Sequence, residues 1–315
     1  MKPIIVFGSI NMDLVTKTPR LPAAGETITG YNFFTAGGGK GANQAVAAAR
    51  LGIPTQIVGR VGGDEFGRQL LADLQTAGVQ TDGVLVEETT SSGVAVITVD
   101  DAGENNIIII PGANGQLNET DVARLSDRLP GAAALLMQLE IPLPIVQLAA
   151  QAAHSIGIPV ILDPAPAQSI PAELYPLVDI ITPNQLEASQ LVGFPVDGEE
   201  AAVQASAVLR QRGVATAIVK LGDRGVFCAT ASETFFVPAF SVQAVDTVAA
   251  GDAFNGALAV ALAEGRPLRE AVVWGAAAGA LSATKAGAQP SLPERKTFEA
   301  FLKERGVSGV MSFKL

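Results

Sequence analysis

Short apolar runs rich in β-branched residues alternate with helical patterns along most of this chain. A buried strand is predicted at PIIVFG (3–8), and an Ala-rich helix closed by Gly52 and Pro54 precedes the next strand, TQIVGRVG. The alternation continues with strands at 134–138, 159–163, 179–183 and 215–222, and helices near 251–263, 267–284 and 295–305 close the chain. This order predicts an α/β fold of three layers, with helices on both faces of a mainly parallel sheet.

Two stretches break the alternation and are predicted to form a small antiparallel sheet beside the main one. Met12–Phe34 contains two prolines and segments of period two, and Ser92–Pro111 has the pattern of a hairpin with the turn DAGEN. Its four isoleucines at 107–110 are apolar on both faces, so a partner chain or closure over a ligand must cover the second face. We therefore expect one domain over 1–315, with lid insertions at about 12–36 and 92–111.

The composition removes several kinds of chemistry. The single His154 and the single Cys228 cannot build a zinc finger, a cysteine cluster or an intrachain disulfide, and a Ser-His-Asp triad is disfavoured. His154 is expected near the end of a helix, and Cys228 is expected to be an inert core thiol. The remaining reactive groups are carboxylates, lysines, backbone amides and bound ions.

The charge balance bears on partners and location. Lysine and arginine number 21 against 31 acidic residues, which gives a net charge of −10, and no basic stretch occurs. Nucleic acid is therefore not an expected partner, because binding its phosphates needs clustered Lys and Arg. The apolar run at the N-terminus is too short for a signal peptide or a membrane span, so we expect no membrane partner and a cytoplasmic location.

The first Gly-rich segment is TAGGGKGANQAVAAARLG at 35–52. Glycines flank Lys40 at the mouth of a helix, where free amides attract anions or polar ligands. A Walker A loop is excluded because Gly41 follows Lys40, and a Rossmann fingerprint is excluded because the glycines do not follow the first strand. A tight strand-to-helix turn is the structural alternative.

The second segment is AVDTVAAGDAFNGAL at 244–258. The small residues Ala249, Ala250 and Gly251 come at a helix start, where their amides can form a hole for an anion. Asp252 projects into the same mouth and can act as a base beside the bound anion. The alternative is that Asp252 only caps the helix.

Together these segments resemble both signatures of the ribokinase-like (phosphofructokinase B) sugar kinases. The resemblance covers nearly the whole chain through NMD at 11–13 and through VGGDEFG, MQLE, TPNQLE, LGDRG and KAGAQPS at 61–67, 137–140, 182–187, 221–225 and 285–291. It implies a doubly covered α/β sheet with a β-lid that often dimerises, and transfer of the γ-phosphate of ATP to a sugar hydroxyl. Phosphoryl transfer mainly requires positioning and charge stabilisation, so no His or Cys is needed.

The resemblance also implies roles for individual residues. Asp252 matches the catalytic base, and Ala249, Ala250 and Gly251 match the anion hole. The sugar-binding positions correspond to Asn11, Asp13, Gly39, Lys40, Asn43, Glu140 and Asp252. The nucleotide positions correspond to Asn184, Lys220, Gly222, Gly225, Gly251 and Asp252.

Two kinds of metal ion follow from the same resemblance. Asn184 and Glu187 match an NxxE motif associated with Mg²⁺ and phosphates, although the residues alone indicate a helix cap with Glu at the third position. A K⁺ site next to the anion hole corresponds to Asp246, Val248, Ser282, Lys285, Gly287 and Ser291. Lys220 replaces a frequent Thr and Lys285 a frequent Arg; the first puts a nucleotide contact in doubt, whereas the second matters little if the backbone carbonyl is the ligand.

The leading hypothesis is phosphorylation of D-ribose at its 5-hydroxyl, with Mg²⁺ accompanying ATP, K⁺ as an activator and a homodimer formed through the lid. Fructose and deoxyribose are alternative substrates, whereas few aromatic residues lie near the expected sugar site to stack on a nucleoside base. An alternative of another class is a non-catalytic sugar-binding protein on this fold. It predicts loss of the base or of the anion hole, and this sequence retains both.

Overall fold

A computed structural model describes residues 1–307 of the chain. Within them the main sheet contains nine strands, whose spatial order is β13 (Thr234–Pro238), β12 (Gly225–Ala229), β11 (Thr216–Lys220), β10 (Ile180–Ile181), β9 (Val160–Leu162), β8 (Ala134–Met137), β1 (Ile4–Phe7), β4 (Thr55–Gly62) and β5 (Val79–Glu87). Strands β11 to β5 run parallel, and β12 and β13 add an antiparallel edge.

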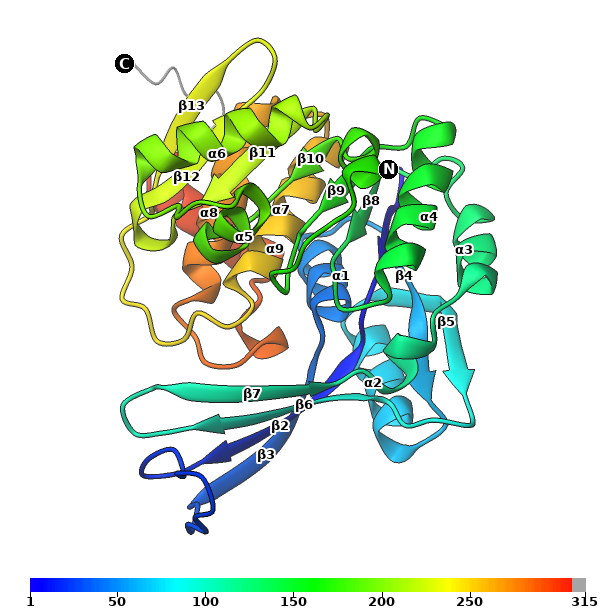
Figure 1. Cartoon of the computed structure of the whole chain (residues 1–315), viewed down its shortest axis with the longest axis vertical. Coiled ribbons are helices and arrows are strands. Elements are labelled where there is room, and N and C mark those ends of the chain that lie inside the picture. The colour runs from blue at the N-terminus through cyan, green and yellow to red at the C-terminus, as the bar shows by residue number, and fades with distance from the viewer. Residues whose placement is uncertain (308–315) are drawn as a thin grey trace.

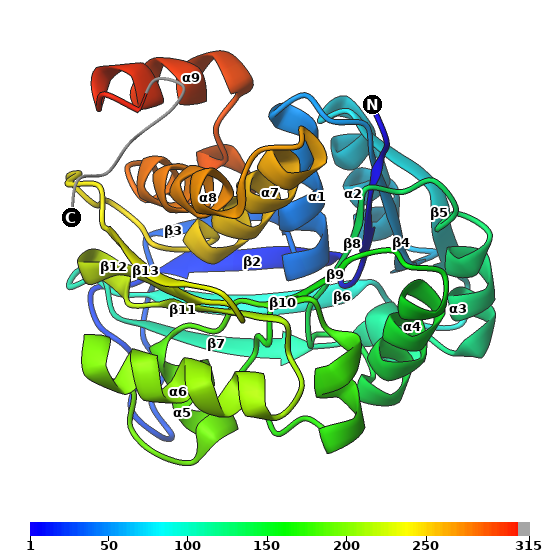
Figure 2. The same ribbon diagram turned by 90° about the horizontal axis from the view of Figure 1, so that it is seen from above.

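Helices cover both faces of this sheet (Figure 2). One layer contains α1 (Lys40–Arg50), α2 (Glu65–Thr76), α7 (Ala250–Ala263), α8 (Leu268–Ser282) and α9 (Arg295–Glu304). The other contains α3 (Glu119–Ser126), α4 (Leu143–Ser155), α5 (Gln185–Val192) and α6 (Glu199–Gln211). Strand β1 is apolar throughout because it serves both layers: Ile4 and Val6 join the core under α1 and α7, whereas Ile5 and Phe7 join the core under α4.

A second, four-stranded sheet projects from one end of the main sheet (Figure 1). We call it the lid sheet, and its order is β3 (Asn32–Gly38), β2 (Asn11–Lys17), β6 (Gly93–Val99) and β7 (Asn105–Ile110). Two antiparallel hairpins form it, as predicted, but they meet through a parallel seam between β2 and β6. All six residues of β7 are exposed, and Phe33 on β3 is 61% exposed.

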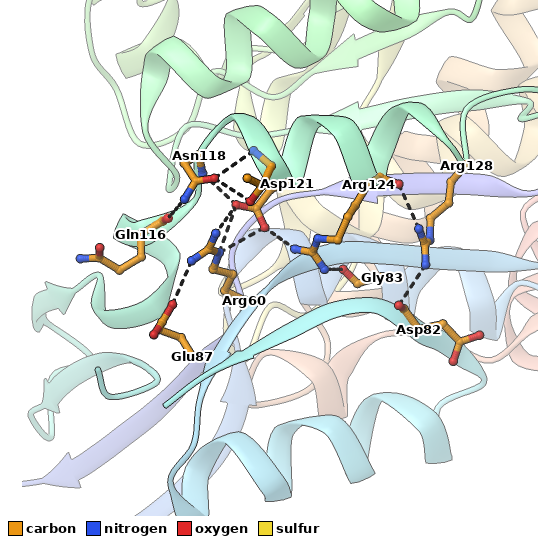
Figure 3. A network of polar contacts seen from close by, with 10 residues as sticks. Arg60, Asp82, Gly83, Glu87, Gln116, Asn118, Asp121, Arg124 and Arg128 are labelled. Atoms are coloured by element: carbon orange, nitrogen blue, oxygen red, sulfur yellow. Dashed lines mark hydrogen bonds and ion pairs between the residues drawn. The ribbon is translucent and has the colours of Figure 1, made fainter. Parts of the chain in front are cut away.

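A buried ionic network fastens the main sheet to α3 (Figure 3). Arg60 at the end of β4 donates from Nε to both carboxylate oxygens of Asp121, at 3.1 and 3.0 Å, and from Nη1 to Glu87 at 3.0 Å. Arg124 also contacts Asp121, and it donates to the carbonyl oxygen of Gly83. Because the Asp121 side chain is fully buried, these donors replace the water that the carboxylate loses on folding.

The three layers and the separate small sheet confirm the predicted fold class. His154 lies in the last turn of α4, and Cys228 is buried on β12, where burial raises the pKa of its thiol to about 12. Strands β5, β12 and β13 were not predicted. None of the helices among residues 1–307 is both long and apolar enough to cross a membrane.

Candidate active site

The carboxyl ends of five neighbouring parallel strands, β1, β8, β9, β10 and β11, meet at one edge of the main sheet. Open α/β sheets bind their ligands at this edge. Polar residues follow four of these strands within three positions, and a lysine ends the fifth, β11: Ser9, Gln138, Glu140, Asp163, Asn184 and Lys220. The edge therefore gathers amide, carboxylate and ammonium groups from distant parts of the sequence.

The Gly-rich segment forms the turn from β3 into α1. Gly39 is the residue before the helix, and the Lys40 amide donates to Glu140 Oε2 at 3.1 Å. Ser9 Oγ donates to the same oxygen at 2.5 Å. The predicted turn and the predicted polar site therefore coincide, because the Glu140 carboxylate satisfies one of the free amides of the helix start.

Asn11 and Asp13 lie at the beginning of lid strand β2, where it leaves the main domain. Both side chains are at least nine-tenths buried. Burial, with the charges of Glu140 and Asp252 nearby, raises the pKa of Asp13 to about 7. Asn114 donates from Nδ2 to Asn11 Oδ1 at 2.7 Å and so holds one end of that amide.

Asp252 lies in the first turn of α7 and is 4% exposed. Its oxygens do not cap the helix: Oδ2 accepts from Asn43 Nδ2 at 2.9 Å and Oδ1 accepts from Gln44 Nε2 at 3.1 Å. The alternative interpretation, in which Asp252 is only a helix cap, is therefore wrong. Burial raises the pKa of Asp252 to about 6, in opposition to Lys40 and the two amide donors.

The residue before α7 has an unusual backbone. Ala249 has φ 60° and ψ 6°, the only positive φ of a non-glycine residue among residues 1–307, and such a conformation costs about 1 to 2 kcal/mol. The Ala250 amide is bonded to the Thr247 carbonyl oxygen at 3.2 Å. A methyl group added at Gly251 would lie 3.3 Å from Lys220 Nζ, so a cation stands directly over the helix start.

Two lysines balance the acidic groups of the site. Burial by itself lowers the pKa of Lys40, but Asp252, Asp163 and Glu140 outweigh burial and raise it. Lys220 Nζ donates to Asp163 Oδ1 at 3.1 Å. Both lysines therefore lie beside carboxylates, and each is available to a phosphate or a hydroxyl that approaches the α7 N-terminus.

The proposed nucleotide residues cluster on the β10–β12 side. Asn184 and Glu187 form a capping box at the start of α5, which confirms the helix cap, and Asn184 pairs with Lys220 through a β-bridge. Burial and the nearby Asp163 raise the pKa of Glu187. Gly222 lies in the short turn after β11, and Gly225 closes that turn by accepting the Leu221 amide at 2.8 Å.

The two loops that carry the expected K⁺ ligands lie side by side. Asp246 accepts the amides of Val248 and Gly287, each at 2.9 Å, and Ser282 Oγ is 2.7 Å from Ser291 Oγ. Among the hydrogen bonds of residues 1–307, none ends on the carbonyl oxygens of Val248, Lys285 or Gly287. A carboxylate with free carbonyl oxygens is a donor set that suits a hard monovalent cation.

A divalent cation finds a different environment. No three acidic, His or Cys side chains in the described part of the chain come together as metal ligands. Glu187 is buried, and its oxygens accept from the Asn184 amide and side chain, each at 2.8 Å. This donor set fits Mg²⁺ that keeps its waters and is held mainly by substrate phosphates.

Five polar residues of the site were not predicted: Ser9, Gln44, Asn114, Gln138 and Asp163. Gln138 and Asp163 each follow a buried run, LLM and VIL, so their place at strand ends was a usable signal. For Ser9, Gln44 and Asn114 the partners lie far away in sequence, and residue pattern alone does not pair them.

Comparison with known proteins identifies the family and similar folds. Residues 1–295 match the family described as pfkB family carbohydrate kinase. The chain is 43% identical over 302 residues to the ribokinase of Haemophilus influenzae, covering 96% of this chain and 99% of that protein, and 37% identical over 300 residues to the deoxyribokinase of Salmonella typhi, covering 95% and 98%. The structure of Arabidopsis thaliana ribokinase complexed with ribose and ATP superposes with a TM-score of 0.88 at 38% identity, covering 96% of this chain and 99% of that chain.

Proposed function

This chain belongs to the pfkB family of carbohydrate kinases, and we propose that within the family it phosphorylates D-ribose at the 5-hydroxyl, using ATP and releasing ADP. The observation that carries the proposal is the Asp252 carboxylate, which is buried at the start of α7 and held by two amide donors beside Lys40. A carboxylate in this position can take the proton of a hydroxyl as that hydroxyl attacks a phosphate.

The sugar is bound between the start of β2 and the start of α1. We assign its hydroxyls to Asn11, Asp13, Gly39, Lys40, Asn43, Glu140 and Asp252. Supporting this, Asn43 Oδ1 is buried without a hydrogen-bond partner among residues 1–307, so an acceptor is left for a ligand hydroxyl. Paired carboxylates and carboxamides reject sugars that lack a hydroxyl, because the buried polar group would then be unpaired.

Phosphoryl transfer then follows from charge and position. Asp252 accepts the proton of the 5-hydroxyl, the hydroxyl oxygen attacks the γ-phosphorus, and the bond from that phosphorus to the bridging oxygen of the β-phosphate breaks to release ADP. The amides at Ala249, Ala250 and Gly251, with Lys220 above them, stabilise the negative charge of the transferring group. Asn184, Lys220, Gly222 and Gly225 position the nucleotide. On binding the phosphate, the Ala250 amide gives up the hydrogen bond that it makes to the Thr247 carbonyl oxygen.

Metal ions complete the charge balance. Glu187 and Asn184 would hold Mg²⁺ indirectly, through its waters, and the ion when bound neutralises the phosphate oxygens. K⁺ is proposed between the 246–248 and 282–291 loops, with Asp246, Val248, Ser282, Lys285, Gly287 and Ser291 as its surroundings. The free carbonyl oxygens of these loops support that assignment.

The outward strands of the lid sheet support a homodimer. Ile108 is 65% exposed and Phe33 is 61% exposed, which is costly for apolar side chains on an otherwise regular sheet. A second copy of the chain, paired lid against lid, would cover them.

We propose that the chain is one domain that carries the lid as two insertions. Its proposed use of ATP supports a cytoplasmic location.

A panel of sugars tests the proposed activity. The purified protein is given ATP, Mg²⁺ and ribose, 2-deoxyribose or fructose, and ADP release is followed by a coupled assay. We expect the highest kcat/KM with ribose. Deoxyribose is the strongest rival, because a relative of similar identity is a deoxyribokinase. Preference for fructose or deoxyribose would overturn the ribose assignment, and ribose binding without ADP release would favour a non-catalytic sugar-binding protein.

A further inference from the structure

We propose that two buried glutamines, Gln44 and Gln138, form an amide relay that positions the catalytic base Asp252 for the transfer. The inference rests on the proposed function, since it assigns a role to residues that support the reacting carboxylate. Neither side chain is expected to touch the sugar or the nucleotide, so both are positioning residues. Gln44 is 1% exposed and Gln138 is 0% exposed.

Gln44 bridges two carboxylates with one amide group. Its Nε2 donates to Asp252 Oδ1 at 3.1 Å and to Asp163 Oδ2 at 3.0 Å. Without a donor between them, these neighbouring carboxylates would repel one another, because each raises the free energy of ionising the other. Gln44 therefore fixes the direction of the Asp252 carboxylate and places a donor between the two acidic groups.

Gln138 supports the orientation of Gln44 that the two carboxylates require. Its Nε2 donates to Gln44 Oε1 at 2.7 Å. A flipped Gln44 would place its oxygen against two carboxylates and its NH₂ group against the NH₂ group of Gln138, so only one orientation satisfies all three neighbours. The polarity of the relay runs from Gln138 through Gln44 to Asp252.

The backbone is shaped to admit this relay. Met137 of β8 is paired with Leu162 of β9. The next residues, Gln138 and Asp163, therefore lie side by side where the two strands end. A Cβ at Gly8 would lie 2.0 Å from Gln138 Oε1, and a Cβ at Gly256 would lie 2.5 Å from that of Ala47. Glycine at both positions lets Gln138 reach across β1 and lets α7 approach α1 closely enough for Gln44 to bond Asp252.

Gln138 also carries an unusual cost that a purely packing role does not explain. Its Oε1 is buried without a hydrogen-bond partner among residues 1–307. An unpaired buried amide oxygen is unfavourable, and a methionine of similar size would avoid that cost. The donor end of Gln138 is therefore the part of the side chain that the site uses.

The relay lies among several charged groups, of which Lys40 and Asp163 act directly on the pKa of Asp252. The groups facing it come from every element around the site: Lys40 on α1, Asp13 on β2, Glu140 after β8, Asp163 after β9, Glu187 on α5 and Lys220 on β11. A hydrogen bond to the carboxylate favours its charged form. Removal of the Gln44 donor therefore raises the pKa of Asp252 above about 6, and a higher pH is then needed for the base to be active.

Steady-state kinetics on the full chain with ribose and Mg-ATP test the relay. We expect Gln44→Met to lower kcat about tenfold to a hundredfold, the scale of one hydrogen bond to a charged group, and to leave the KM for ribose nearly unchanged. The acid limb of the kcat–pH profile should move upward by about one pH unit. Gln138→Met should lower kcat and move the acid limb in the same directions but by less. In this variant Gln44 still donates to both carboxylates and loses only the hydrogen bond from Gln138.

Gln75→Met is the matched control, because Gln75 on α2 donates its amide to Thr81, outside the site. It should leave kcat and the pH profile as in the wild type. An unchanged kcat in Gln44→Met, or a loss of kcat without movement of the acid limb, would overturn the relay. If circular dichroism shows that Gln44→Met is unfolded, Gln138→Met decides by the same two measurements. A wild-type protein that does not phosphorylate ribose refutes the proposed function instead.

Discussion

The carboxyl edge of the main sheet and the outward face of the lid sheet differ in how their groups are satisfied. At the edge, Asp252 is 4% exposed and receives two amide donors from α1. On the lid, Ile108 is 65% exposed and its strand β7 has no buried residue. The edge is completed by the chain itself, whereas the lid presents apolar surface that the described chain leaves uncovered. The two amide donors that orient Asp252 therefore come from its own chain, whereas the apolar face of the lid is left uncovered by it.

The largest effect at the carboxyl edge of the main sheet is expected from Asp252→Asn. The amide keeps the size of the side chain but cannot take a proton, so kcat should fall by about 10²- to 10⁴-fold. Calorimetry should still detect ribose, because the other polar side chains of the sugar site remain. Near-normal turnover in this variant would contradict the role of Asp252 as the base.

The next test concerns the ionic network that fastens the main sheet to α3, away from both regions. Asp121→Asn removes the charge that faces Arg60 and Arg124 in the network of Figure 3. The free energy of unfolding should fall by about 3 kcal/mol, the scale for breaking a buried ion pair, as measured by urea denaturation at pH 7. Glu65→Gln is the control, since its ion pair with Arg68 is exposed and should contribute little.

The pH dependence of this effect has a definite sign. Burial opposes ionisation of Asp121, but donors from Arg60, the Asn118 amide and Arg124 outweigh it and lower the pKa of the folded state. The ion pair therefore stabilises the fold above the unfolded pKa of about 3.9, and the stabilisation is lost as pH falls below it. The stabilities of wild type and Asp121→Asn should converge in acid; a constant difference down to pH 2 would contradict this account.

A smaller effect is expected from the monovalent cation. Replacement of Na⁺ by K⁺ at constant ionic strength should raise turnover severalfold, since the 246–248 loop leads directly into the helix start that carries Asp252. Asp246→Asn should weaken this response while ribose still binds. Equal rates in the two salts would remove the cation site from the proposal.

The smallest effect on turnover is expected from the lid. Ile108→Glu places a charge on the exposed strand and should convert a dimer into a monomer, as measured by sedimentation equilibrium. Val203→Glu is a matched control, because Val203 is 43% exposed but lies on α6, away from the lid. A monomeric wild type would remove the lid-paired homodimer and leave the apolar face to another occupant.

The same contrast explains what could be predicted from the sequence. The layered fold and the hairpins of the lid are local patterns of period and turn residues, and they were predicted. The parallel seam between β2 and β6 was not, because nothing local distinguishes it from an antiparallel one. Strand β5, VQTDGVLVE, was not predicted either. Its pairing with β4 shifts register between Gln56 and Val58, so its apolar residues do not alternate regularly along the whole strand.

The candidate site divides in the same way. Lys40, Asp252 and the Asn184–Glu187 cap lie in recognisable helix starts, so their places were predicted. Gln44 was not, because it reads as an interior residue of an Ala-rich helix. Its hydrogen-bond partners are Asp163 and Asp252, whose positions relative to α1 are set only when the sheet and α7 pack together. The single-domain organisation and the individual site roles remain predictions.

The bonds from Asn43 and Gln44 to Asp252 join residues 209 and 208 positions apart. At about 5 to 20 residues per second, a ribosome needs roughly 10 to 40 seconds between synthesis of the two ends of each bond. During that interval the nascent chain can already contain α1 and most of the main sheet, but it still lacks Asp252. With Asp252 as the proposed base, we expect every unfinished chain to be inactive until α7 has left the ribosome.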